Sequence, residues 1–236
     1  MEDEVTLQRT SDSIRVALPG RSSLALPRAP LPESFLQWQS QARLRVFAAL
    51  TEQGADAVRM NAAHLPVMAT LGADGCFPVN LACKAMSLLP RPERLENATR
   101  QFERARTQAE ERSWPDTLAQ RVQAARAFYS QLENVDRWTL GGLEIFTGQT
   151  ARNLQRYPLA ALLYTGEAPS FLSYQLTGVV ELAAKGSPYY RFLRAARELF
   201  AFDAFHIPQP DYTVGYLFHV VEVRDKTPLP LGATNR

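Results

Sequence analysis

The feature that most constrains the fold is a series of strand patterns joined by turns or short helices. After residue 140 the chain shows several apolar strand patterns, and it has no regular alternation of strands with long helices. This order favours an antiparallel barrel with helices packed outside it. The expected strands of this part are Leu143–Thr147, Leu159–Tyr164, Phe171–Ala184 and Val214–Arg224.

Strand signals also occur nearer the N-terminus. The apolar runs His64–Leu71 and Phe77–Met86 flank the turn signal Gly72-Ala-Asp-Gly75, which predicts a β-hairpin. Residues 1–30 contain several prolines and show no helical period, so we expect an extended arm lying on the body or on a partner subunit. Short strands at Val5–Leu7 and Ile14–Leu18 are compatible with such an arm.

Four longer segments carry helical signals. Residues 33–53 have an apolar stripe that ends at Gly54. Residues 91–134 lack glycine and are split by Ser113-Trp-Pro115, which predicts a helical hairpin over about 91–111 and 115–133. Because strands precede and follow this pair, we expect a helical insertion at about 88–138. A further helix begins after Ser187-Pro188.

Composition excludes several classes of protein. The chain has 236 residues, 46% of them apolar, and no run is long enough to cross a bilayer. A net charge of +2 does not favour binding to nucleic acid or to an anionic membrane. The acidic start differs from a signal peptide, so we expect a cytoplasmic protein in which Cys76 and Cys83 are reduced. The histidines lack metal-ligand spacing, and no metal is expected.

The residues with the clearest chemical signal lie at a predicted helix N-terminus. Thr147, Gln149 and Thr150 form a polar turn with Gly148, and Arg152 follows inside a short helix that Pro158 ends. Free backbone N–H groups and the helix dipole favour an anion there, and a guanidinium suits phosphate oxygens. The turn therefore predicts a phosphate-binding site. The alternative is ordinary turn chemistry, with Thr150 capping only its own helix.

The same residues carry a resemblance to a known family. Phe146-Thr147 followed by Thr150-Ala-Arg-Asn-Leu-Gln-Arg-Tyr-Pro158 resembles the flavin-binding split barrels of the pyridoxamine 5'-phosphate oxidase-like group. Ala73-Asp-Gly75 with Pro78 is similar to the opening hairpin of that family, and Phe218–Pro228 is similar to its closing strand. The strand Tyr174–Leu182 matches a family strand with a central glycine, here Gly178.

The resemblance implies a cofactor and a quaternary structure. Family members usually bind FMN between two subunits, and a minority bind a deazaflavin or haem. Thr147, Thr150 and Arg152 match the phosphate-binding pattern. Alternation places Asn80 and Lys84 on one face of their strand, which lines the flavin in the family. Lys84 could instead reach solvent from an edge strand.

The chain also departs from the family pattern. The helical insertion separates strands that a tight turn usually joins, and the C-terminus lacks the arginine–histidine pattern of the vitamin-forming enzymes. We therefore expect a relative of pyridoxamine phosphate oxidase and not that enzyme itself. No catalytic side chain can be named. His219 fits a barrel residue better than a ligand, and Trp138 either packs in the core or borders the flavin.

Together these patterns predict an α+β protein with a mainly β core. We expect an antiparallel split β-barrel with flanking helices, preceded by an arm and helix over residues 1–60 and extending over 61–236. The leading hypothesis is an FMN-binding oxidoreductase that acts on a small molecule as a homodimer. The alternatives are a non-catalytic flavin or haem binder and a cofactor-free barrel that binds another protein.

Overall fold

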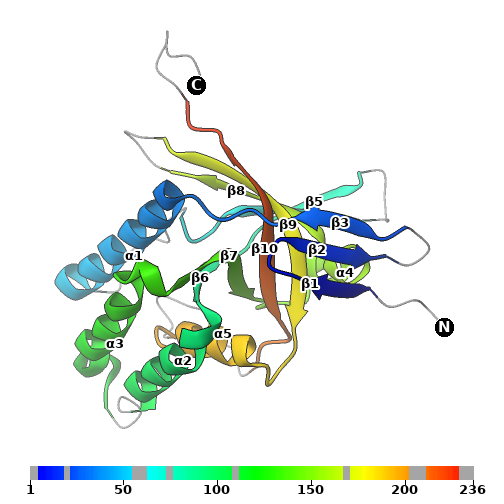
Figure 1. Cartoon of the computed structure of the whole chain (residues 1–236). Coiled ribbons are helices and arrows are strands. Elements are labelled where there is room, and N and C mark those ends of the chain that lie inside the picture. Colours follow the sequence, from blue (N-terminus) through cyan, green and yellow to red (C-terminus); the bar gives the residue numbers. More distant parts are fainter. Residues whose placement is uncertain are drawn as a thin grey trace.

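The computed structural model describes residues 5–18, 22–54, 63–72, 77–107, 112–166, 171–201 and 211–228. Two antiparallel sheets and a group of helices make up this part of the chain (Figure 1). The large sheet contains β4 (Val67–Leu71), β5 (Val79–Cys83), β6 (Ser87–Pro90), β7 (Val135–Leu143), β8 (Leu159–Thr165), β9 (Ser173–Ala183) and β10 (Gly215–Asp225). The helices are α1 (Glu33–Gln53), α2 (Pro92–Thr107), α3 (Trp114–Tyr129), α4 (Gln149–Arg156) and α5 (Pro188–Glu198), with a 3-10 turn, η2, at Leu132–Asn134.

The large sheet confirms the expected α+β class and antiparallel pairing. Its strand order is β5-β4-β8-β9-β10-β7-β6. The edge strands β5 and β6 do not pair with each other in this order, although only residues 84–86 separate them in the chain. Three residues span little more than about 10 Å. The two edges therefore lie close together, and the sheet must curl strongly.

The strand before the polar turn differs from the sequence prediction. It is β7, Val135–Leu143, and not Leu143–Thr147. The reason is the pair Gly141 and Gly142, which lies inside the strand where neighbouring segments approach closely. A Cβ atom on Gly142 would collide with the carbonyl oxygen of Ala85 and would lie 2.9 Å from the sulfur atom of Met86. Glycine marks a close backbone approach here and not the start of a strand.

The N-terminal arm is a three-stranded sheet, whereas the sequence predicted two short strands. It contains β1 (Thr6–Arg9), β2 (Ser13–Ala17) and β3 (Leu24–Pro27), paired in that order. Ile14 and Val16 are fully buried and pack with Val179 of β9 in a small hydrophobic cluster. The arm therefore covers one face of the large sheet, as Figure 1 shows.

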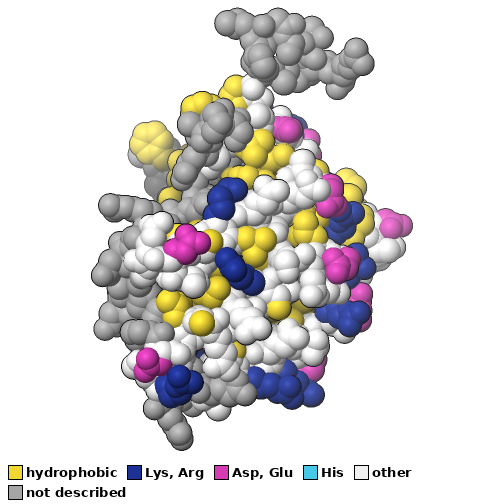
Figure 2. Space-filling model, turned by 90° about the vertical axis from the view of Figure 1, so that its left-hand side faces the viewer, with side chains coloured by type: hydrophobic (Ala, Val, Ile, Leu, Met, Phe, Trp, Pro, Cys, Tyr) yellow, Lys and Arg dark blue, Asp and Glu magenta, His cyan; other side chains and the backbone are white. Residues whose placement is uncertain are grey.

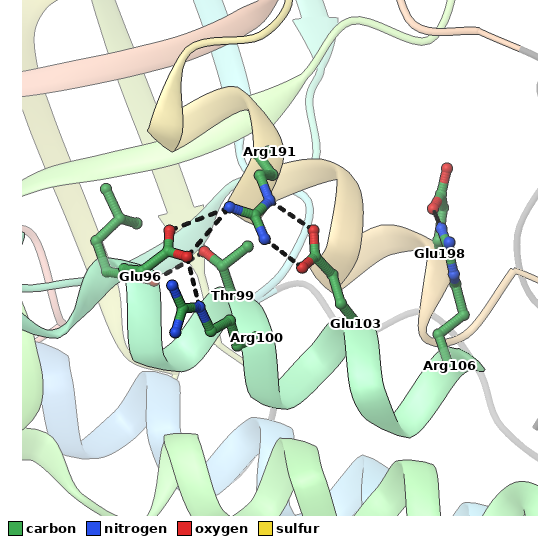
Figure 3. Close-up of polar contacts among 8 residues, drawn as sticks. Glu96, Thr99, Arg100, Glu103, Arg106, Arg191 and Glu198 are labelled. Atoms are coloured by element: carbon green, nitrogen blue, oxygen red, sulfur yellow. Dashed lines mark hydrogen bonds and ion pairs between the residues drawn. The ribbon is translucent and has the colours of Figure 1, made fainter. Parts of the chain in front are cut away.

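The helical insertion lies where the sequence predicted it. The helices α2 and α3 separate β6 from β7, and these two strands are antiparallel neighbours. Arg191 of α5 reaches α2, where it pairs with Glu96 (Nη1–Oε2 3.1 Å) and with Glu103 (Nε–Oε1 2.7 Å), as Figure 3 shows. Arg106 of α2 pairs with Glu198 of α5 in the same view.

One hydrophobic core joins the helices to the large sheet. Phe47 of α1 contacts Tyr129 of α3 and stacks on Phe200, and Phe102 of α2 stacks on Phe192 of α5. On the face seen in Figure 2, Lys and Arg side chains are interspersed with Asp and Glu side chains, in keeping with the small net charge. No helix in the described ranges combines the length and hydropathy needed to span a bilayer.

Candidate phosphate-binding site

The polar turn of the sequence prediction leads directly into α4. Gly148 is the N-cap residue, with φ of −113°, and within the described part of the chain no side chain caps the helix. Thr150 was expected at the cap, but it occupies the second helical position and is only 3% exposed. The helix ends at Tyr157, before Pro158, as the sequence predicted. The first N–H groups of α4 thus donate to no capping side chain among the described residues.

A buried polar network fixes this helix on the large sheet. Asn80 Nδ2 of β5 donates to Thr150 Oγ1 at 3.1 Å and to Thr70 Oγ1 of β4 at 3.3 Å. Asn153 Nδ2 of α4 donates to the same Thr70 oxygen at 3.1 Å. These residues hold α4 against β4 and β5, and Thr150 points into the protein interior.

The remaining predicted residues lie at the surface of the same helix end. Thr147 is exposed, and its hydroxyl lies 3.0 Å from that of Thr213, which precedes β10. Arg152 is exposed and donates to Gln149 Oε1 at 2.8 Å. Gln149 in turn donates to Asn153 at 2.7 Å. A guanidinium, hydroxyl groups and backbone N–H groups therefore meet at one accessible helix N-terminus.

This donor set fits a phosphate. The N-terminal end of a helix attracts anions through its N–H groups and dipole. Arg152 keeps donors beyond the single bond to Gln149, because a guanidinium carries five N–H groups. The residues present at this helix end therefore suit the phosphate of a nucleotide-like ligand.

Lys84 has a different setting. Its ammonium group donates to both carboxylate oxygens of Glu144, at 2.7 and 2.9 Å. The side chains of Lys84 and Glu144 are 15% and 1% exposed. Lys84 also lies 5.9 Å from the centre of the Tyr216 ring. The structure thus places Lys84 in a buried ion pair, while Asn80 joins the network beneath α4.

His219 and Trp138, which the sequence also singled out, lie outside α4, in β10 and β7. Both ring nitrogens of the fully buried His219 have partners, Thr139 and Glu181. Trp138 lies half-buried in β7 with the Arg28 guanidinium over its ring. The turn at Ala73-Asp-Gly75, Cys76, His206 and the last eight residues lie outside the described ranges.

Sequence reasoning missed three residues of this region. Thr70 and Asn153 complete the buried network, and Thr213 meets Thr147. Asn153 stands inside the motif that suggested the family, so its amide was a detectable signal. Thr70 and Thr213 carry no local signal, because only the tertiary fold brings them to α4.

Comparisons with known proteins complete this description. No family model and no curated protein matches the sequence. Among solved structures, tagged HupZ from Group A Streptococcus has a TM-score of 0.40 and 16% identity, over 69% of this chain and 85% of its own. An FMN-binding protein from Syntrophomonas wolfei has a TM-score of 0.38 and 13% identity, over 84% and 95%. A Listeria innocua protein, named as a presumed pyridoxamine 5'-phosphate oxidase, has a TM-score of 0.39 and 11% identity, over 78% and 97%.

Proposed function

We propose that this chain binds FMN and acts as a flavin-dependent oxidoreductase. The observation that carries the proposal is the N-terminus of α4, which no side chain caps and beside which Thr147 and Arg152 are exposed. In the family that the sequence resembles, the corresponding positions bind the cofactor phosphate. Bound FMN would supply the hydride or electron transfer, as flavins do in other enzymes.

The residues of this chain then divide into two roles. Thr147, Gln149 and Arg152 would contact the phosphate, because they lie at the surface around the helix end. Asn80 and Thr150 would position α4 from beneath, through the hydrogen bond that joins them. The ion pair of Lys84 with Glu144 would fix the segment between β5 and β6.

The proposal includes a split-barrel architecture. The support is the short link between the two edges of the large sheet, since residues 84–86 connect β5 directly to β6. Lys84 and Met86 still donate backbone hydrogen bonds to the segment before β4, to Pro66 and His64 respectively. These bonds extend the pairing of β4 with β5 toward the opposite edge.

The proposal also includes a homodimer. The outward face of β4, β5 and β8 is apolar, and it continues into a groove of 390 Å³ beside β3. Leu71, Val79, Leu81 and Leu163 are 43–66% exposed on this face. Contiguous apolar surface of this kind marks protein interaction sites, and closed twofold dimers are the commonest assembly. A second copy of this chain is the occupant that we propose.

Titration of the purified protein with FMN tests the cofactor assignment. After free FMN has been removed by gel filtration, we expect the protein to retain the flavin absorption band at about 450 nm. Arg152→Ala should weaken FMN binding by about 1.5–3 kcal/mol, because a charge-assisted bond to phosphate is lost. Arg156→Ala is the matched control, since it removes the same charge from the other end of α4. Protein that does not bind FMN, or equal losses in both variants, would contradict the assignment.

Turnover separates the oxidoreductase from its alternatives. FMN binding without oxidation of reduced nicotinamide would favour a flavin carrier. A protein with a haem spectrum would use one of the minority cofactors of the family. A colourless protein that binds neither cofactor would be a barrel that acts through protein contacts.

A further inference from the structure

A second large cavity lies between the N-terminal sheet and the large sheet. It has a volume of 1150 Å³, in or above the range of small-molecule sites. Residues of β1, β7 and β9 and of the end of α4 line it, and none of the phosphate-site residues is among them. The cavity is therefore separate from the site proposed above.

Arg28, which follows β3, lines this cavity without an ion pair among the described residues, and the charge of Asp136 acts on it only from beyond ion-pair distance. Its guanidinium lies 5.2 Å from the centre of the Trp138 ring, and Nη1 donates to the carbonyl oxygen of Thr10 at 3.2 Å. Its Nε is buried and has no hydrogen-bond partner among the described residues. Within the described part of the chain, no carboxylate lies within ion-pair distance of Arg28. Partial burial lowers the pKa of this guanidinium, and the charge of Asp136 opposes that shift.

The acidic residues of the cavity do not supply the missing anion. Glu181 already accepts from His219 Nε2 at 2.9 Å and pairs with Arg9 Nε at 3.5 Å. Asp136 accepts from the backbone N–H of Trp138 at 2.7 Å, and burial raises the pKa of this carboxyl. A buried donor without a partner is costly, so a ligand acceptor at Arg28 would be favourable.

The apolar residues that line the cavity indicate the chemistry of the rest of the ligand. Leu7 of β1, Leu154 of α4 and Leu182 of β9 line the same cavity and offer apolar surface. A dianion such as a phosphate would be repelled by Glu181, which also faces the cavity. A planar monoanion, such as a carboxylate, matches one edge of the guanidinium group. It carries one negative charge fewer than a dianion and is therefore repelled less by Glu181.

We propose that this cavity binds a small amphipathic carboxylate. Its anionic group pairs with Arg28, and its apolar part packs against Leu7 and Leu154. The proposal does not depend on FMN, because the cavity shares no residue with the phosphate site.

Calorimetric titration with three probes of eight carbon atoms each tests this site. Octanoate, 1-octanol and octylammonium carry an anionic, a neutral and a cationic head group. We expect octanoate to bind the wild-type protein at least tenfold more tightly than octanol. Arg28→Met should lower octanoate affinity at least tenfold, while Arg15→Met, which removes an exposed charge from β2, should not change it. Thermal unfolding followed by circular dichroism checks that both variants are folded.

Fluorescence locates the probe independently of the arginine variants. Octanoate at Arg28 should change the emission of Trp138, and Trp138→Phe should abolish that change while binding persists. The proposal is overturned if octanoate does not bind, if octanol binds equally well, or if octylammonium binds most tightly. Unchanged octanoate affinity in Arg28→Met would also overturn it. If Arg28→Met does not fold, the relative affinities of the three probes for the wild-type protein test the proposal.

Discussion

A Cβ atom placed on Gly178 of β9 would collide with the backbone carbonyl oxygen of His219 on the neighbouring strand β10. The same atom would lie 2.7 Å from the Phe218 ring. Gly178 is opposite Val220, next to the point where the register of β9 and β10 shifts. The glycine that suggested the family thus serves strand packing, since only a residue without a side chain fits.

Gly178→Ala is therefore expected to destabilise the protein. A forced backbone shift in a packed interior costs about 1–3 kcal/mol. Gly148→Ala is the control, because its added Cβ would lie 3.7 Å from the nearest atom outside the adjacent residues. Its cost at a helix N-cap should stay below about 1 kcal/mol. Urea unfolding measures both variants, and equal costs would contradict the steric explanation.

Removal of the Lys84 ammonium group should lower the stability of the fold more than Gly178→Ala does. Lys84→Met leaves the carboxylate of Glu144 buried without its partner, which costs about 3–5 kcal/mol for a broken buried pair. Adding Glu144→Gln should restore part of the lost stability, because the uncompensated charge disappears. The free energies of unfolding of the single and double variants measure this coupling. A double variant less stable than Lys84→Met would contradict the explanation that the unpaired Glu144 charge causes the loss of stability.

His219 should make stability depend on pH. Burial lowers the pKa of His219, although the hydrogen bond to Glu181 opposes this shift. The unfolded chain therefore binds a proton near the ordinary histidine value of about 6.5, before the folded protein does. Stability should fall as the pH drops through this value.

A comparison of His219→Gln with the wild type tests whether His219 causes the fall in stability at lower pH. The glutamine cannot titrate, so the melting temperature should change less between pH 7 and pH 5.5. The raised pKa of Asp136 makes stability increase as the pH falls, which is opposite to the effect of His219. The lowered pKa of Glu181 affects stability only at lower pH. Both carboxyls remain in the variant, but the hydrogen bond from His219 is the main cause of the lowered pKa of Glu181, and His219 also acts on Asp136, so the comparison reports His219 together with these two couplings. An unchanged pH profile would exclude the contribution of His219.

The apolar face of β4, β5 and β8 should hold the proposed dimer together. Leu81→Lys places a charge at its most exposed leucine, which is 66% exposed, and should convert dimers to monomers. Gln101→Lys adds the same charge on the exposed side of α2 and should leave the dimer intact. Light scattering during size-exclusion chromatography measures both. A monomeric wild type, or a Leu81→Lys variant that still dimerises, would contradict the proposal.

The sequence predicted local structure well where a period or a cap defined it. The bounds of α1 match the prediction, and Ser187 caps α5 by accepting a hydrogen bond from Tyr190 N. Alternation along β5 was also correct, since Val79 and Leu81 are exposed while Asn80 is half-buried. All three features depend on neighbours in the chain, which a sequence displays directly.

The errors occurred where long-range contacts decide the structure. The prediction ran one strand through to Met86, whereas β5 ends at Cys83 and β6 pairs with β7 on the other edge of the sheet. Lys84 was expected at the phosphate or flavin, or in solvent, and its partner is Glu144, sixty residues away. No local pattern contains such a pairing, because it follows from the curl of the whole sheet.

The insertion of α2 and α3 has a consequence for how this chain could be rebuilt. Pro90 is opposite Val135, and the N–H of Arg91 donates to Asn134 at 2.9 Å, so the segment leaves and re-enters the sheet at one point. A whole module could therefore be exchanged there, by evolution or by design, without a change in strand register. The new module would have to cover the aromatic surfaces of α1 and α5 that Tyr129 and Phe102 now occupy.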